Sequence, residues 1–186
     1  EVRQMLDQLK QDYPAVVDEV NSTLSLGKIQ KVFQGLLEEQ VSIRNQVVIL
    51  ETLADYASVS GEPDFLVEKA RQALGRQICL QYADSERTIR VVTVEPSLER
   101  KIVDSRVETA SGAISALPPD ERRAWTDAVG EQVRAMQEKG LLPVILTSEA
   151  ARSLIKTSIR REMPDVAVLS IPEIAADIRV ESVGEI

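Results

Sequence analysis

The sequence predicts a mixed α+β fold, in which an all-helical N-terminal subdomain, residues 1–80, precedes a small α/β subdomain, residues 81–186, with a mixed, partly parallel sheet. Three observations predict this fold. Apolar residues recur at helical spacing in the first part. In the second part, β-branched and continuous apolar runs alternate with helical stretches. The length of 186 residues and the 44% hydrophobic content are sufficient to bury a core without disulfides.

The helical subdomain is predicted to contain four main segments, residues 1–20, 25–38, 42–57 and 65–78. Within the first, Pro14 opens a second short helix. The second has an apolar stripe at the spacing i, i+3, i+4, i+7 and i+8, formed by Ile29, Val32, Phe33, Leu36 and Leu37. We expect Ser25 to cap the second segment and Ser42 to cap the third.

Strand and helix signals alternate after residue 80. The β-branched run 88–94 predicts a strand, and Pro96 opens a helix after it. The small and polar residues of 104–117 predict a mobile loop. A long helix is then expected from Pro118 to Lys139, with Trp125 on its buried face.

Two fully apolar runs, residues 143–146 and 166–169, flank a helix that Thr147 or Ser148 caps. Continuous apolar strands around a helix are typical of a parallel βαβ unit that is covered on both faces. Residues 178–183 predict an additional edge strand. These elements complete the α/β subdomain.

Missing residue types exclude several kinds of chemistry. The chain has no histidine, and therefore no imidazole base and no histidine metal ligand. Its single cysteine, Cys79, excludes an internal disulfide and is expected to be a small buried hydrophobic residue. The net charge of −8 disfavours binding to nucleic acid. We expect no cofactor, no metal and no nucleic-acid partner.

The remaining motifs do not predict a reaction. Gly27-Lys28 is not a P-loop, because Ser22 and Ile29 replace the glycine and the hydroxyl residue that the motif requires. Paired carboxylates lie at predicted helix ends or turns, where solvated acids are common: Asp18-Glu19, Glu38-Glu39 and Asp120-Glu121. The longest apolar run, residues 141–146, is far shorter than the ~20 residues of a membrane span. We expect a soluble part of a longer protein from a reducing compartment, without membrane contact of its own.

Three stretches, in this order along the chain, carry a further signal. The first joins Gly27–Leu37 and Val41–Arg44 to Ile49–Ala57. The second comprises Val67, Arg71, Ala73–Arg76 and Ile78, and the third comprises Pro143–Ser148, Arg152, Pro164, Val168–Ser170, Glu173–Ile174, Arg179–Val180 and Val183–Gly184. Together they resemble the type III export-gate (FHIPEP) family, which has flagellar and virulence-secretion branches, and the resemblance covers the whole chain.

The resemblance implies a large membrane protein whose cytoplasmic portion, at the inner face of the bacterial inner membrane, builds a nonameric homo-oligomeric ring. That portion has four subdomains, and this chain matches the helical third and the ring-building α/β fourth. The implied role is non-enzymatic: the family receives export chaperone–cargo complexes, mainly at the first two subdomains, and contacts other export-apparatus proteins.

Four polar positions in the matching stretches are candidate structural or interface residues: Arg44, Asn45, Arg76 and Arg152. The family usually has an aspartate where this chain has Asn45. If Ser42 is the N-cap, residue 45 is at N3, where a carboxylate contributes about 0.3–1 kcal/mol through the helix dipole. Arg44 is either an interdomain salt-bridge residue or an exposed arginine on the first turn of the helix.

Two other function classes remain. The chain could be a soluble protein–protein adaptor module unrelated to secretion, or, as the weakest reading, an enzyme that uses carboxylate chemistry. Several apolar segments of about 20 residues in the upstream reading frame would favour the export gate over the adaptor. A rise in melting temperature with nucleotides or metals would favour the enzyme.

Overall fold

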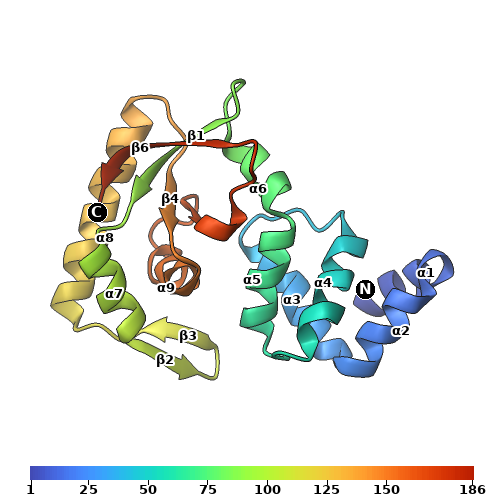
Figure 1. Ribbon diagram of the computed structural model, residues 1–186. Helices are drawn as coiled ribbons and strands as arrows, with labels where there is room; N and C mark the ends of the chain where they lie inside the picture. Colours follow the sequence, from blue (N-terminus) through green and yellow to red (C-terminus); the bar gives the residue numbers. More distant parts are fainter. The chain divides into compact units, whose positions relative to one another are not determined.

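Six helices form the first of two units in the computed structural model, which describes all 186 residues (Figure 1). The first unit is Glu1–Ile78 and the second is Cys79–Ile186. The helices of the first unit are α1 (Val2–Asp12), α2 (Pro14–Thr23), α3 (Leu26–Glu38), α4 (Gln46–Ala57), α5 (Pro63–Ala73) and α6 (Gly75–Tyr82), which extends past the boundary. Contacts of α4 with α2 and α5, and of α3 with α5, enclose an aliphatic core.

The α3 segment largely follows the sequence expectation. Ser25 is the N-cap, and its hydroxyl accepts a hydrogen bond from the Lys28 amide, which confirms the predicted cap. Four residues of the predicted stripe are buried, but Leu37 is exposed and does not belong to it. The helix ends at Glu38, and Gln40 then adopts a left-handed backbone with a φ of 59°. This turn redirects the chain toward α4.

The third predicted helix begins at Gln46, so the expected start at Ser42 is wrong. Two side-chain bonds explain the delay. The Ser42 hydroxyl accepts from the Arg44 amide at 3.4 Å, and the Ser42 carbonyl accepts from Gln77 Nε2 at 2.9 Å. These bonds give the backbone of residues 42–45 an alternative to the helical pattern. The predicted helix over 65–78 is also divided, since α5 ends at Ala73 and α6 begins at Gly75.

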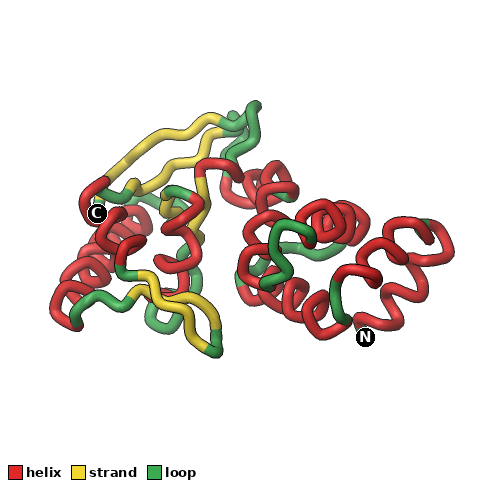
Figure 2. Tube along the Cα trace, turned by 60° about the horizontal axis from the view of Figure 1, so that its bottom comes forward, coloured by secondary structure: helices red, strands yellow, loops and turns green.

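The second unit contains a four-stranded sheet of β1 (Thr88–Thr93), β4 (Val144–Thr147), β5 (Ala167–Ser170) and β6 (Arg179–Glu185). The strand order is β5-β4-β1-β6, and all three pairings are parallel. Its helices are α7 (Pro96–Asp104), α8 (Pro119–Glu138), α9 (Glu149–Ile159) and the short 3₁₀ helix Ile171–Glu173. Figure 2 distinguishes helices, in red, from strands, in yellow, along the chain. The mixed fold class is confirmed, as are the βαβ unit β4-α9-β5 and the edge strand β6.

Residues 104–117 include a β-hairpin, so the loop predicted for this segment is wrong. Strands β2 (Arg106–Thr109) and β3 (Gly112–Ser115) make an antiparallel hairpin. Gly112 has a φ of 111°, which favours glycine, and the Thr109 hydroxyl donates to the Gly112 carbonyl at 2.7 Å. Every residue of β2 is exposed, and its sequence contains one apolar residue, Val107, so it shows no hydrophobic alternation that would predict a strand.

The core of the second unit lies between the sheet and its helices. Trp125 is buried in it together with Val129 of α8, Ile145 of β4, Leu154 of α9 and Val168 of β5, which confirms the predicted position of the indole. Cys79 is buried as expected, and burial raises the pKa of its thiol. No helix in either unit is both long and apolar enough to cross a membrane.

Glu99 links α7 to the end of β4 through two hydrogen bonds. Its carboxylate accepts from the Thr147 hydroxyl at 2.6 Å and from the Ser148 amide at 3.1 Å. Partial burial acts to raise the pKa of Glu99, but the hydrogen bonds outweigh it and the net pKa is lowered. A lowered folded-state pKa means that the carboxylate stabilises the fold above the unfolded value of about 4.3, and that this contribution is lost as the pH falls through the folded pKa.

We therefore expect Glu99→Gln to lower the free energy of unfolding at pH 7 by about 1–2 kcal/mol. The difference from the wild type should shrink as the pH falls below about 4. Urea denaturation between pH 7 and pH 3 measures it. Glu51→Gln, at an exposed position of α4 where the side chain forms no hydrogen bond or ion pair, is the control and should behave like the wild type throughout. A difference that persists unchanged at pH 3 would contradict the ionic origin.

Candidate interaction surfaces

No group of three or more histidine, cysteine, aspartate or glutamate side chains is placed to hold a metal ion. The four positions singled out in the sequence occupy two different environments. Arg44, Asn45 and Arg76 lie in the first unit, and Arg152 is buried in the second.

Arg44 and Asn45 lie in the segment between α3 and α4, and both are exposed. Asn45 is the N-cap residue of α4, not N3, and its side chain makes no capping bond. The expected loss of a carboxylate at N3 therefore does not apply. Arg44 forms no ion pair within the chain; its backbone amide donates to Ser42 instead.

Arg76 is exposed on the first turn of α6. The neighbouring residue Gln77 donates to the Ser42 carbonyl, so the start of α6 lies beside the segment that carries Arg44 and Asn45. The structure thus brings three of the four candidates to one part of the surface. Their role as interface residues stays a prediction.

Arg152 has one of the largest side chains that are fully buried in the protein. It lies on α9, and its Nη1 donates to the Val168 carbonyl of β5 at 3.3 Å. Lys156 lies one turn later on the same face of α9 and is also buried. Its Nζ donates to the carbonyls of Val166 at 2.8 Å and Pro164 at 3.0 Å.

These bonds cover the free edge of the sheet. The Ala167 amide donates to the carbonyl of Pro143, the residue just before β4, and the parallel pairing of β4 with β5 then turns the carbonyls of Val166 and Val168 toward the outer edge. The Ser170 amide and hydroxyl are bound by the buried Glu173 carboxylate, at 2.7 Å and 2.8 Å. The charged trio, defined as Arg152, Lys156 and Glu173, thereby occupies backbone groups that would otherwise be open to strand pairing.

Lys156 and Glu173 were not among the candidate residues predicted from the sequence, although Glu173 lies in the third matching stretch. A signal for each was present in the sequence. Arg152 and Lys156 have i, i+4 spacing on the apolar stripe of α9, and Ser170 with Glu173 fits the capping-box pattern. A charged residue within an apolar stripe is a reason to look for buried acceptors.

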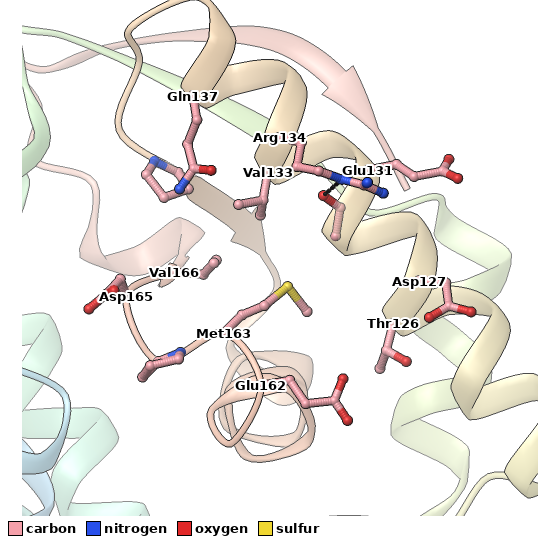
Figure 3. Close-up of a pocket in the computed structure, with 13 residues that line it drawn as sticks. Thr126, Asp127, Glu131, Val133, Arg134, Gln137, Glu162, Met163, Asp165 and Val166 are labelled. Atoms are coloured by element: carbon pink, nitrogen blue, oxygen red, sulfur yellow. Dashed lines mark hydrogen bonds between the residues drawn. The ribbon is translucent and has the colours of Figure 1, made fainter.

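An open groove with a volume of about 590 Å³ lies between α8 and the turn before β5 (Figure 3). We call it the α8 groove, and it is lined by Thr126, Asp127, Gly130, Glu131, Val133, Arg134, Gln137, Pro143, Glu162, Met163, Pro164, Asp165 and Val166. Four carboxylates and a single cation, Arg134, lie around it. The sequence did not reveal the groove because its walls are about 30 residues apart and each wall, taken alone, has the composition of a solvated surface.

Comparison with known proteins identifies the family to which the chain belongs. The model of the FHIPEP family matches residues 1–179. The flagellar biosynthesis protein FlhA of Borreliella burgdorferi is 44% identical over 180 residues, which is 97% of this chain and 26% of that protein. The chain thus spans about a quarter of the length of this relative.

Two solved structures cover nearly all of the chain. The nonameric EscV cytosolic domain of a type III secretion system matches 100% of this chain and 55% of that one, with a TM-score of 0.80 and 31% identity. The Chlamydia pneumoniae CdsV and CdsO complex matches 99% of this chain and 54% of that one, with a TM-score of 0.84 and 29% identity. The resemblance inferred from the three sequence stretches is confirmed, and the chain belongs to the FHIPEP family.

Proposed function

We propose that this chain is part of the cytoplasmic portion of a flagellar or type III protein export gate, where it acts as a non-enzymatic, ring-forming platform. The observation that carries the proposal is the match of residues 1–179 to one family model, together with 44% identity to a flagellar relative. In the proposed setting, the chain lies at the cytoplasmic face of the bacterial inner membrane, and segments of the parent protein outside this chain anchor it.

We further propose that the helical subdomain, residues 1–80, and the α/β subdomain, residues 81–186, both contribute to a homo-oligomeric ring. The solved EscV relative is a nonamer, which supports this assembly. Arg44 is exposed and has no ion-pair partner in its own chain, and it is therefore available to pair with an acid of a neighbouring subunit or subdomain. Asn45 and Arg76 are the other proposed contacts on this surface.

The proposed partners are other export-apparatus proteins and chaperone–cargo complexes. The CdsV relative was solved in complex with CdsO, which supports contact with a second protein. Chaperone–cargo complexes are proposed for the whole protein, with docking mainly at subdomains outside this chain. The alternative, a soluble protein–protein adaptor unrelated to secretion, makes a different prediction: protein export should not require this chain.

Export by cells that carry variants of the full-length protein tests the proposal. Deletion of the segment should abolish the appearance of flagellar or type III substrates in the medium, while the truncated protein remains in the membrane. Arg44→Glu should reduce export, because it reverses the charge at the proposed contact. Arg100→Glu, at an exposed position of α7 without a partner, is the matched control and should export normally.

Normal export after deletion of the segment would overturn the proposed function and favour the adaptor. Normal export by Arg44→Glu, together with loss of export in the deletion, would retain the platform and reject Arg44 as a contact. Immunoblotting of the membrane fraction distinguishes a lost function from a lost protein.

A further inference from the structure

We propose that the α8 groove is a docking site for one amphipathic helix of a partner protein, with basic residues on both sides of an apolar stripe. Three independent features of the groove support this: its apolar floor, its unpaired charges and a glycine in its wall. The inference does not depend on the proposed export role, because each feature belongs to the folded second unit itself.

The floor of the groove is an extension of the core. Val133 of α8 and Met163 of the turn pack against the core cluster but are only partly buried, and Val166 beside them is buried within that cluster. Figure 3 shows Val133, Met163 and Val166 on facing sides of the groove. Apolar side chains that continue from a core into an open groove are a surface that an apolar stripe can cover. The methionine adds a flexible contact that adapts to the shape of a partner.

The charges around this floor are not neutralised within the chain. The carboxylates of Asp127 and Glu131 on α8, and of Glu162 and Asp165 on the turn, form no hydrogen bond or ion pair. The only cation, Arg134, donates its Nε to the Gly130 carbonyl at 3.3 Å. Unpaired acids on both sides of an apolar floor are complementary to a helix whose lysines or arginines flank its apolar stripe.

Gly130 is the third feature. It lies inside the 20-residue helix α8, where glycine is less favourable than alanine. A Cβ at this position would have no atom within 4 Å, so packing within the chain does not require a glycine. Because Gly130 lines the groove, its missing side chain lets a second backbone approach α8 closely.

The dimensions favour a helical occupant. Thr126 and Gln137 mark the two ends of the lining on α8, and a helix rises 1.5 Å per residue, so this wall is about 16 Å long. That length matches about three turns of a second helix. A second copy of this chain is a poorer source of the helix, because the net charge of the chain is −8 and the occupant has to be basic.

A designed peptide tests the site. The probe is a fluorescein-labelled amphipathic helix of about three turns, with leucines on one face and lysines and arginines flanking them. Fluorescence anisotropy with the whole chain should detect binding in about 50 mM salt, and binding should weaken in about 500 mM salt. A peptide of the same composition with the leucines dispersed should bind at least about tenfold more weakly. Absence of binding by the amphipathic peptide at low salt would overturn the proposal.

Two pairs of variants locate the binding. Asp127→Lys with Glu131→Lys reverses two charges at the groove and should weaken binding at least about tenfold. Glu51→Lys with Asp55→Lys is the matched control, because it changes the same charge at the same i, i+4 spacing on an exposed face of α4. The control should bind like the wild type. Equal losses in both double variants would show attraction to overall charge only and would overturn the assignment to the groove.

A substitution of Gly130 distinguishes an effect on peptide binding from an effect on stability. Gly130→Ala should raise the melting temperature by about 2–4 °C, as a glycine-to-alanine change inside a helix does, and yet weaken peptide binding several-fold. Gly27→Ala on α3 also has open space at its Cβ, and it should leave binding unchanged. If Gly130→Ala bound the peptide with wild-type affinity, this would overturn the claim that the peptide backbone approaches α8 closely at Gly130. If Gly130→Ala lost self-association in sedimentation but bound the peptide like the wild type, the groove would be assigned to a second copy of the chain and the partner helix would be rejected.

Discussion

Trp125→Ala should lower the free energy of unfolding by about 3–5 kcal/mol, as truncation of large aromatic residues in cores does. Trp125 is only 5% exposed and packs in the core cluster of the second unit with residues of α8, α9, β4 and β5. The truncation would leave a cavity among elements that are held by the sheet and that cannot close over it without distorting the parallel strands. Urea denaturation followed by circular dichroism measures the loss.

The indole nitrogen provides an internal comparison. Trp125 Nε1 is buried without a hydrogen-bond partner, so the indole is held by packing alone. Trp125→Phe should therefore cost much less than Trp125→Ala, because it keeps an aromatic ring and removes an unpaired N–H group. Leu142→Ala, at a leucine that is 56% exposed, is the control and should change stability by less than about 0.5 kcal/mol. A loss in Trp125→Phe as large as that in Trp125→Ala would contradict a packing role.

Elements with one strong periodic signal could be predicted from the sequence. The spacing of apolar residues within single segments predicts three features: the stripe of α3, the burial of Trp125 and the unit β4-α9-β5. The caps at Ser25 and Ser148 follow from local chemistry, since each hydroxyl accepts from an amide three residues later. For these elements, the apolar spacing and the capping residues of a single segment were sufficient to predict the structure.

Elements that depend on distant partners could not be predicted in this way. The start of α4 is set by Gln77, which lies 35 residues from the carbonyl it binds. The hairpin β2–β3 has no hydrophobic alternation in β2, and Ser115 of β3 is fixed by the Ser105 hydroxyl at 2.8 Å. A pattern read along the chain contains neither contact, and so residues 104–117 resemble a loop.

The candidate sites also differ in whether a local signal or a contact between distant residues defines them. Arg44, Asn45 and Arg76 were selected by resemblance, and the structure places all three on the surface, where exposure alone does not define a role. The charged trio and the α8 groove arise from side chains that the fold brings together. A sequence pattern detects residue types, whereas burial decides whether a cation is a solvated surface group or a donor within a core.

Arg152→Ala should lower the free energy of unfolding by about 3–5 kcal/mol, through a cavity and a lost donor together. Arg152 is 1% exposed, and its Nη1 binds the Val168 carbonyl at the outer edge of β5. Hydrogen exchange of the β5 amides should accelerate along with the global loss, because the edge strand loses one of the side chains that hold it. Arg100→Ala on the exposed face of α7 is the control and should leave both measurements unchanged.

Arg152→Met separates the volume of the side chain from its charge. Methionine fills most of the space but cannot donate, and a buried acceptor that loses its donor costs about 1–3 kcal/mol. We therefore expect an intermediate loss of stability and, in contrast to the wild type, increased self-association as the β5 edge becomes available for pairing. Replacing buried charges with apolar residues is stabilising in some proteins, because the desolvation of the charge is avoided. If Arg152→Met were as stable as the wild type and self-associated no more than it does, Arg152 would only fill space, and the protection of the β5 edge would then rest on Lys156 and Glu173 alone.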